Sequence, residues 1–145
     1  MKYAISACLV GTCCKYNGGH NRNEKLIEFL KDKDYILVCP EVTGGLPTPR
    51  APSEIVGTRV MNTLGQDVSE EFLRGAQIEF NKVVEEEVDV AILQPRSPSC
   101  GKDKIYDGTF QGKLVDGDGI FVQMLKKEEI TVYTSEEFLK KTVTK

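Results

Sequence analysis

The sequence predicts an α/β domain in which a parallel β-sheet carries helices on both faces. Segments with strand and helix patterns alternate along the chain, in the order β-α-β-loop-α-β-loop-α-β-α. The segment 88–93 is apolar at nearly every position, which is typical of a strand covered on both faces. The chain has 145 residues, enough for one domain with a hydrophobic core but too few for two ordinary ones. We therefore expect a single three-layer, Rossmann-like α/β domain over residues 1–145.

Four strands are expected in this sheet. In chain order they are Lys2–Ala7, Tyr35–Val38, Val88–Leu93 and Ile130–Tyr133. With right-handed crossovers, we predict the strand order 2-1-3-4. In that order the chain reverses its winding direction beside strand 1, and ligands of such sheets bind outside the carboxyl ends at the reversal point.

Helices are expected between the strands, because apolar residues recur there at helical spacing. Their approximate ranges are 24–31, 69–86, 120–127 and a short one from 134 to 139. The expected caps are Asn23 or Asn21, Asp118, and a capping box made by Thr134 and Glu137, while Ser69 with Glu70 and Glu71 should start the longest helix. The buried face of the longest helix should consist of Phe72, Ala76, Phe80, Val83 and Val84.

Two connecting segments are expected to lack regular structure. Prolines recur between residue 39 and about residue 65, and each one removes an amide donor and restricts φ. A loop of this length in a compact domain is usually functional. The segment 105–110 is expected to form only a short hairpin-like turn.

The composition excludes several classes of protein. Hydrophobic residues make up 40% of the chain, charged residues 28%, and the net charge is −3, as is typical of a soluble globular protein. No basic stripe suits duplex nucleic acid, and no apolar run is long enough for a membrane span. The first residues run into a strand without the pattern of a signal peptide, so we expect a cytoplasmic protein. In that reducing compartment, five cysteines favour metal binding or catalysis over disulfides.

Three of the five cysteines follow three of the predicted strands, namely Cys8, Cys39 and Cys100. Neighbouring strands lie about 4.8 Å apart, so three strand ends span about 10 Å. Three thiolates with one open position suit a catalytic metal, and soft thiolates select iron–sulfur clusters, zinc or Cu(I). A 4Fe-4S cluster on three cysteines would keep one iron free as a Lewis acid. The same residues would also suit a plain apolar core, since free cysteine is often buried.

Five further residues near these cysteines are candidate site residues. Glu41 would transfer protons beside a metal, or else simply pair with Arg50. The hydroxyls of Ser97 and Ser99 would hold an anion or a carbonyl oxygen, or else serve an ordinary turn. We predict that Ser99, Arg50 and Gly45 contact the substrate, although Arg50 would equally suit a surface salt bridge.

Three sequence blocks together resemble a known protein family. They are Ser6–Gly11 with Cys14–Gly18, Cys39–Val42 with Gly44–Arg50, and Ser97–Gly101 with Ile105–Phe110. The resemblance is to a small bacterial family, long known only as a domain of unknown function, that includes thiouracil desulfidase. It covers nearly the whole chain.

The resemblance implies a cofactor, a reaction and a set of site residues. It implies a 4Fe-4S cluster bound by the three cysteines Cys8, Cys39 and Cys100, with the fourth iron open, and catalytic roles for Glu41 and Ser97. The reaction would be hydrolytic removal of sulfur from a small thiolated base such as 2-thiouracil, which releases hydrogen sulfide and needs no reductant.

One segment departs from the family pattern, and two other functions stay open. Leu93-Gln94-Pro95-Arg96 replaces a Leu-Lys-Glu-Arg type of segment, and Pro95 removes an amide from the expected pocket wall. Cys13 and Cys14 are expected to have an ordinary loop role, with a sulfur-handling or redox role as the alternative. A non-catalytic sensor or sulfur carrier that binds a cluster or zinc is the alternative function. A metal-free cysteine nucleophile would require one indispensable thiol instead of three.

Overall fold

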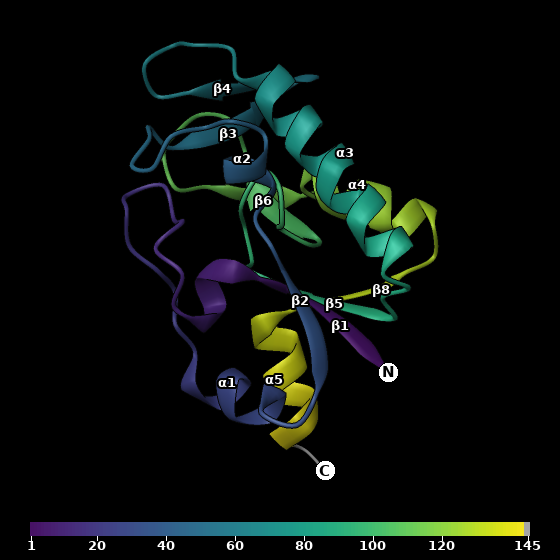
Figure 1. Ribbon diagram of the computed structural model, residues 1–145. Coiled ribbons are helices and arrows are strands. Elements are labelled where there is room, and N and C mark those ends of the chain that lie inside the picture. Colours follow the sequence, from purple (N-terminus) through teal and green to yellow (C-terminus); the bar gives the residue numbers. More distant parts are fainter. Residues whose placement is uncertain (144–145) are drawn as a thin grey trace.

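The computed structural model describes residues 1–143 and contains a four-stranded parallel sheet (Figure 1). Its strands are β1 (Lys2–Ser6), β2 (Asp34–Val38), β5 (Val90–Leu93) and β8 (Thr131–Thr134). They lie in the order β2-β1-β5-β8, and every neighbouring pair is parallel. The expectation of an α/β fold built on a parallel sheet is therefore confirmed. Since β1 lies between β2 and β5, the winding direction reverses beside β1.

Helices cover both faces of this sheet, which gives three layers. The helices α1 (Glu24–Leu30) and α5 (Ser135–Val143) cover one face, and α3 (Ser69–Glu85) and α4 (Ile120–Lys127) cover the other (Figure 1). Within residues 1–143, no helix combines the length and the apolar character needed to cross a bilayer.

The strand residues divide between the two layers by alternation. On β1, Tyr3 and Ile5 belong to the core under α1 and α5, whereas Ala4 belongs to the core under α3 and α4. On β5, Ile92 and Leu93 divide in the same way. All five side chains are at most 8% exposed, so both faces of these central strands are buried, as their nearly continuous apolar character predicts.

The stretch after β2 is more regular than its prolines suggest. It contains the short helix α2 (Pro40–Thr43) and an antiparallel hairpin of β3 (Ser53–Val56) and β4 (Arg59–Asn62). The prediction of irregular structure from residue 39 to residue 65 was therefore wrong. The prolines end at Pro52, and Gly57 supplies the positive φ of 63° in the two-residue turn between the strands.

A second small sheet stands where only a turn was expected. β6 (Lys104–Tyr106) pairs with β7 (Leu114–Asp116) in an antiparallel ladder. The pairing partner begins four residues beyond the segment 105–110 whose pattern was visible, so the short local pattern did not reveal it.

Two helix caps agree with the sequence. The side chain of Asn23 accepts a hydrogen bond of 3.2 Å from the backbone N–H of Leu26 at the start of α1. At the start of α5, Thr134 and Glu137 exchange reciprocal hydrogen bonds of 2.9 and 3.0 Å, which is the predicted capping box.

The predicted cap of α4 was wrong. Gly119 occupies the cap position and makes no side-chain bond there. The Asp118 carboxylate instead accepts a 2.8 Å hydrogen bond from the backbone N–H of Asp103 and forms an ion pair with Lys126. The Asp118 side chain thus interacts with residues distant in sequence and does not make the α4 cap that the local sequence predicted.

The buried face of α3 also differs from the predicted one. Val84 is 49% exposed, whereas the carboxylate residue Glu79 is only 4% exposed. The apolar side chains Phe72, Ala76 and Val83 are buried as expected.

Candidate active site

Three cysteines line one pocket at the carboxyl ends of β1, β2 and β5. Cys8 lies on the 3-10 turn η1 (Ala7–Val10) that directly follows β1, so this strand ends one residue earlier than expected. Cys39 lies between β2 and α2, and Cys100 lies in the loop after β5. The pocket has a volume of about 620 Å³ and is lined by all three residues. Segments that are far apart in sequence therefore bring three cysteines to the wall of one pocket.

These thiols lie in a largely apolar and partly hydrogen-bonded environment. Cys8 is 8% exposed and Cys100 is 5% exposed. The Asn21 side-chain amide donates to the sulfur of Cys8 at 3.6 Å. Burial raises the pKa of the Cys100 thiol to about 12, while hydrogen bonding with Cys14 lowers the pKa of Cys8. A thiol such as Cys100 keeps its proton in the metal-free protein, and a bound metal would displace that proton.

The donor set consists of thiols, which suit an iron–sulfur centre. Thiolates are the ligands that such clusters use in proteins. Across residues 1–143, no group of three or more His, Cys, Asp or Glu side chains is placed to hold one metal ion.

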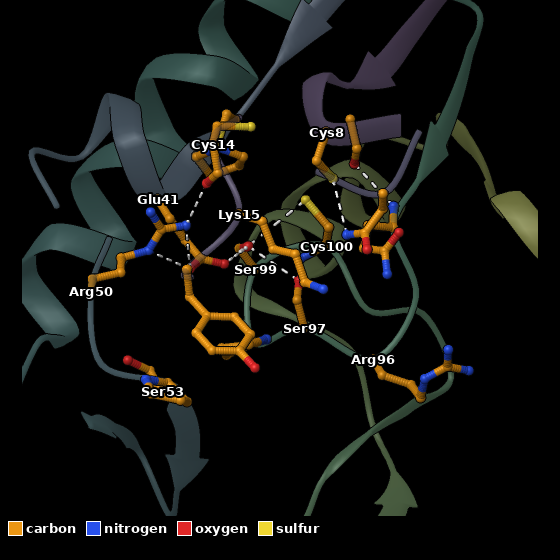
Figure 2. A pocket seen from close by; sticks show the side chains of 18 of the residues that line it. Cys8, Cys14, Lys15, Glu41, Arg50, Ser53, Arg96, Ser97, Ser99 and Cys100 are labelled. Carbon is orange, nitrogen blue, oxygen red and sulfur yellow. Dashed lines mark hydrogen bonds and ion pairs between the residues drawn. The ribbon is translucent and has the colours of Figure 1, made fainter. Parts of the chain in front are cut away.

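Cys14 lies beside the proposed ligands. It is 8% exposed, it lines the same pocket, and it belongs to the apolar cluster that contains Cys8 and adjoins Cys39. Its backbone oxygen accepts a 2.9 Å hydrogen bond from Arg50 (Figure 2). Cys13, in contrast, is exposed. Both cysteines lie in the segment between η1 and α1, and their ordinary loop role stays a prediction.

The carboxylate of Glu41 is held from two sides at the pocket wall. Figure 2 shows it between the Arg50 guanidinium and the Ser99 hydroxyl. Arg50 Nε and Nη2 each lie 3.2 Å from Glu41 Oε1, and the Ser99 hydroxyl donates to Glu41 Oε2 at 2.8 Å. The side chains of Glu41 and Arg50 are 16% and 8% exposed. The pairing with Arg50 and the position at the cysteine pocket, which the sequence left as alternatives, therefore occur together.

Arg50 directs its guanidinium into the protein. Besides Glu41 and the Cys14 oxygen, it donates to Pro47 O at 3.3 Å and Thr48 Oγ1 at 3.1 Å. Its five N–H donors are thus engaged by the chain itself. These contacts describe a residue that orients Glu41, while contact between Arg50 and the substrate stays a prediction.

Ser97 and Ser99 extend the hydrogen-bond network from Glu41 along the loop after β5. Their hydroxyl oxygens lie 3.3 Å apart, and Ser97 Oγ accepts a 2.8 Å bond from the backbone N–H of Cys100. Ser99 is 2% exposed and also lies 3.7 Å from the Cys100 sulfur. The turn role and the pocket role of this loop therefore coincide, and the loop places two hydroxyls next to a candidate ligand.

Two other predicted features differ in their relation to the pocket. Pro95 lines it, so the departure from the family pattern does lie in its wall. Gly45 is not among the lining residues; it follows α2 with a φ of 98°. A role for Gly45 in substrate binding stays a prediction.

Sequence reasoning missed several residues of the pocket wall. They are Lys15, Tyr16, Asn21, Tyr106 and Phe110. Apart from Asn21, all lie inside the sequence blocks quoted above, so their presence in those blocks was an available signal. Glu54 of β3 accepts hydrogen bonds of 2.9 and 3.1 Å from the backbone N–H groups of Gly108 and Phe110, which anchors this part of the wall.

Comparison with known proteins agrees with this geometry. The family model described as 2-thiouracil desulfurase matches residues 4–137, which is most of the chain. The chain belongs to the 2-thiouracil desulfurase family. The predicted family is thereby confirmed, and so is the prediction of an enzyme over a non-catalytic binding protein, because the family is named for a desulfurating activity.

Two relatives of this desulfurase family member cover almost its full length. The uncharacterized protein YbbK of Bacillus subtilis (strain 168) is 36% identical over 143 residues, which are 92% of this chain and 95% of YbbK. A solved structure of the [4Fe-4S]-dependent thiouracil desulfidase TudS superposes with a TM-score of 0.90 at 34% identity. That match covers 99% of this chain and 96% of TudS.

Proposed function

We propose that this protein removes sulfur hydrolytically from a small thiocarbonyl heterocycle such as 2-thiouracil and releases hydrogen sulfide. One observation carries the proposal: three cysteines from separate segments and a hydrogen-bonded carboxylate line the same pocket. The similarity to a [4Fe-4S]-dependent thiouracil desulfidase supports it. The enzyme would act in the cytoplasm on free thiolated bases, as one Rossmann-like domain that needs neither nucleic acid nor a membrane.

The proposed cofactor is a 4Fe-4S cluster on Cys8, Cys39 and Cys100. The support comes from the donor set, since all three cysteines line one pocket and two of them are at most 8% exposed. When bound, the cluster supplies a thiophilic Lewis acid that polarises the carbon–sulfur bond of the substrate.

Glu41 is the proposed general base. The reaction adds water to the thiocarbonyl carbon and exchanges sulfur for oxygen, so one proton must leave the water and protons must reach the departing sulfide. Glu41 would take the proton from water and return it to sulfur, and a positioned base of this kind contributes about 10²–10⁴-fold to a rate. Arg50 and Ser99 hold this carboxylate in one orientation, so it does not have to be ordered during the reaction.

Ser97 and Ser99 have distinct proposed tasks in the same network. Ser99 is nearly fully buried and its hydroxyl donates a hydrogen bond to Glu41. Its proposed task is to fix the orientation of the base, with only marginal contact to the substrate. Ser97 is partly exposed to the pocket and would donate its hydroxyl hydrogen to the oxygen that forms on the substrate carbon.

The test is an anaerobic assay on cluster-loaded protein. Wild-type protein should contain about four iron and four acid-labile sulfide per chain, and it should release sulfide from 2-thiouracil. Glu41→Gln should keep the iron content and lose sulfide release by at least about 10²-fold. The matched control is Glu24→Gln, a change of an exposed carboxylate remote from the pocket, which should keep full activity.

Two outcomes would contradict the proposal. Loaded wild-type protein that leaves a panel of thiolated bases intact would instead support a sensor or sulfur carrier. Sulfide release that survives in a metal-free preparation would remove the need for the cluster.

A further inference from the structure

A buried carboxylate lies directly behind one of the proposed cluster ligands. Glu79 of α3 is 4% exposed, and its Oε2 accepts a 2.6 Å hydrogen bond from the backbone N–H of Cys39. Its neighbours on the same helix face, Phe72, Ala76 and Val83, are apolar and fully buried. A carboxylate in such a row is unfavourable unless it is partnered, so the contact with Cys39 explains its position.

The second oxygen of this carboxylate is linked to the end of β2. Lys82 Nζ lies 3.5 Å from Glu79 Oε1 and donates a 2.8 Å hydrogen bond to the backbone oxygen of Leu37. The Lys82 side chain is 43% exposed, so solvent screens its charge, whereas the Glu79 side chain is 5% exposed. Lys82 therefore compensates only part of the negative charge of Glu79, whose other oxygen lies next to Cys39.

Local backbone chemistry makes this hydrogen bond important for Cys39. Cys39 caps α2 with φ and ψ of −150° and 86°, and no side chain satisfies that cap. The next residue, Pro40, has no amide hydrogen. Glu79 gives the Cys39 N–H a carboxylate acceptor at 2.6 Å, and its loss would remove this partner from a part-buried donor.

The rest of α3 holds the same segment against translation. A Cβ atom on Gly75 would lie 1.7 Å from the backbone oxygen of Pro40, so the two backbones are in direct contact. Arg74 donates a 2.7 Å hydrogen bond to the backbone oxygen of Gly44 at the end of α2. Glu79 is thus one of several α3 residues that contact the segment between β2 and residue 44. Among those described here, it is the one that contacts Cys39, the proposed cluster ligand.

We propose that Glu79 is a positioning residue for the cluster, which fixes the direction of Cys39 and opposes one-electron reduction of the bound centre. This inference rests on the proposed function, since it takes Cys39 as a ligand. Partners of metal ligands commonly orient them and tune the metal. A reduced cluster carries one more negative charge, so a nearby buried carboxylate lowers the reduction potential. A hydrolytic desulfidase benefits, because its centre is required as a Lewis acid and not as an electron carrier.

The experiment compares two variants of Glu79 with a matched control after anaerobic cluster reconstitution. Glu79→Gln keeps an acceptor oxygen but removes the charge, Glu79→Leu removes both, and Glu85→Gln changes an exposed charge on the same helix. We expect Glu79→Leu to lose the cluster in air several-fold faster than wild type. We expect Glu79→Gln to keep wild-type iron and sulfide content, with a reduction potential shifted upward. Glu85→Gln should match wild type in both measurements.

The readouts separate this inference from the proposed function. If Glu79→Leu does not fold, the potential of Glu79→Gln still decides the charge effect. A Glu79→Gln potential equal to that of wild type, or a Glu79→Leu cluster as long-lived as the wild-type one, would overturn the inference while the cluster assignment stands. A wild-type protein that takes up no cluster would instead overturn the proposed function.

Discussion

Replacing Arg50 by Met tests the contact network around the base most directly. The substitution keeps an unbranched stem of similar length but removes all five N–H donors. The Glu41 carboxylate, 16% exposed, then loses a charged partner worth about 2 kcal/mol, and the Cys14 carbonyl loses the hydrogen bond that the guanidinium donates to it, worth about 1 kcal/mol. The bonds to Pro47 and Thr48 are exposed and contribute little. The expected loss in the free energy of unfolding is about 3 kcal/mol.

Urea unfolding of the reduced, metal-free protein measures this loss, because these contacts involve only the chain itself. With a urea slope of about 2 kcal/mol/M, the midpoint should fall by about 1.5 M. Sulfide release by the cluster-loaded variant should fall about 10²-fold, since Glu41 is no longer oriented. Arg50→Lys keeps the charge and should recover part of both losses.

The control is Arg22→Met, which removes an exposed pairing with Glu24 and should leave the urea midpoint unchanged. If Arg50→Met and Arg22→Met unfold at the same urea concentration, the guanidinium does not hold Glu41 in place. The account of Arg50 as an orienting residue would then be wrong.

Three further predictions concern the ligand set, the serine next to the base, and acid stability. Iron content after reconstitution should fall severely in the single serine variants of Cys8, Cys39 and Cys100, whereas Cys14→Ser should retain the wild-type iron content; equal losses in all four would refute the three-cysteine set. Ser99→Ala should lower sulfide release about 10-fold to 10²-fold with iron content unchanged, because Glu41 loses one of its two holding partners; a wild-type rate would contradict this. Hydrogen bonds from Ser69 lower the pKa of Asp67 from 3.8 to about 2, so its contribution to stability is complete above pH 3.8 and is lost as the pH falls toward 2. Asp67→Asn should therefore flatten the pH dependence of unfolding in this window, and an unchanged acid profile would disprove the assignment.

The family likeness and the pocket geometry support each other because they rest on different observations. The family model matches residues 4–137 as a sequence. The pocket, in contrast, follows from the parallel sheet, which gathers Cys8, Cys39 and Cys100 at one edge. A protein with the blocks but another sheet order would not bring these thiols together.

Local sequence patterns were sufficient for most of the sheet and its helices. Apolar strand segments, helical spacing and the Thr134–Glu137 capping box are short-range signals, and the structure contains the corresponding elements. Where a partner came from far along the chain, local reasoning failed. Asp118 interacts with Asp103 and Lys126 and does not cap α4 as predicted. β6 pairs with β7, which lies beyond the segment whose pattern was visible.

The residues of the candidate site also fall into two groups, those predicted from local sequence and those revealed only by tertiary contacts. The positions of Cys8, Cys39 and Cys100 after apolar strands, and of Glu41 two residues after Cys39, were readable because strand ends and residue spacing are properties of the chain alone. The sequence did not predict that Cys14 is buried. It also did not predict that Arg50 and Ser99 hydrogen-bond to Glu41, or that the Cys39 N–H donates to Glu79. Each depends on which side chains from remote segments meet in space, and only the packing of α3 and the loops against the sheet decides that.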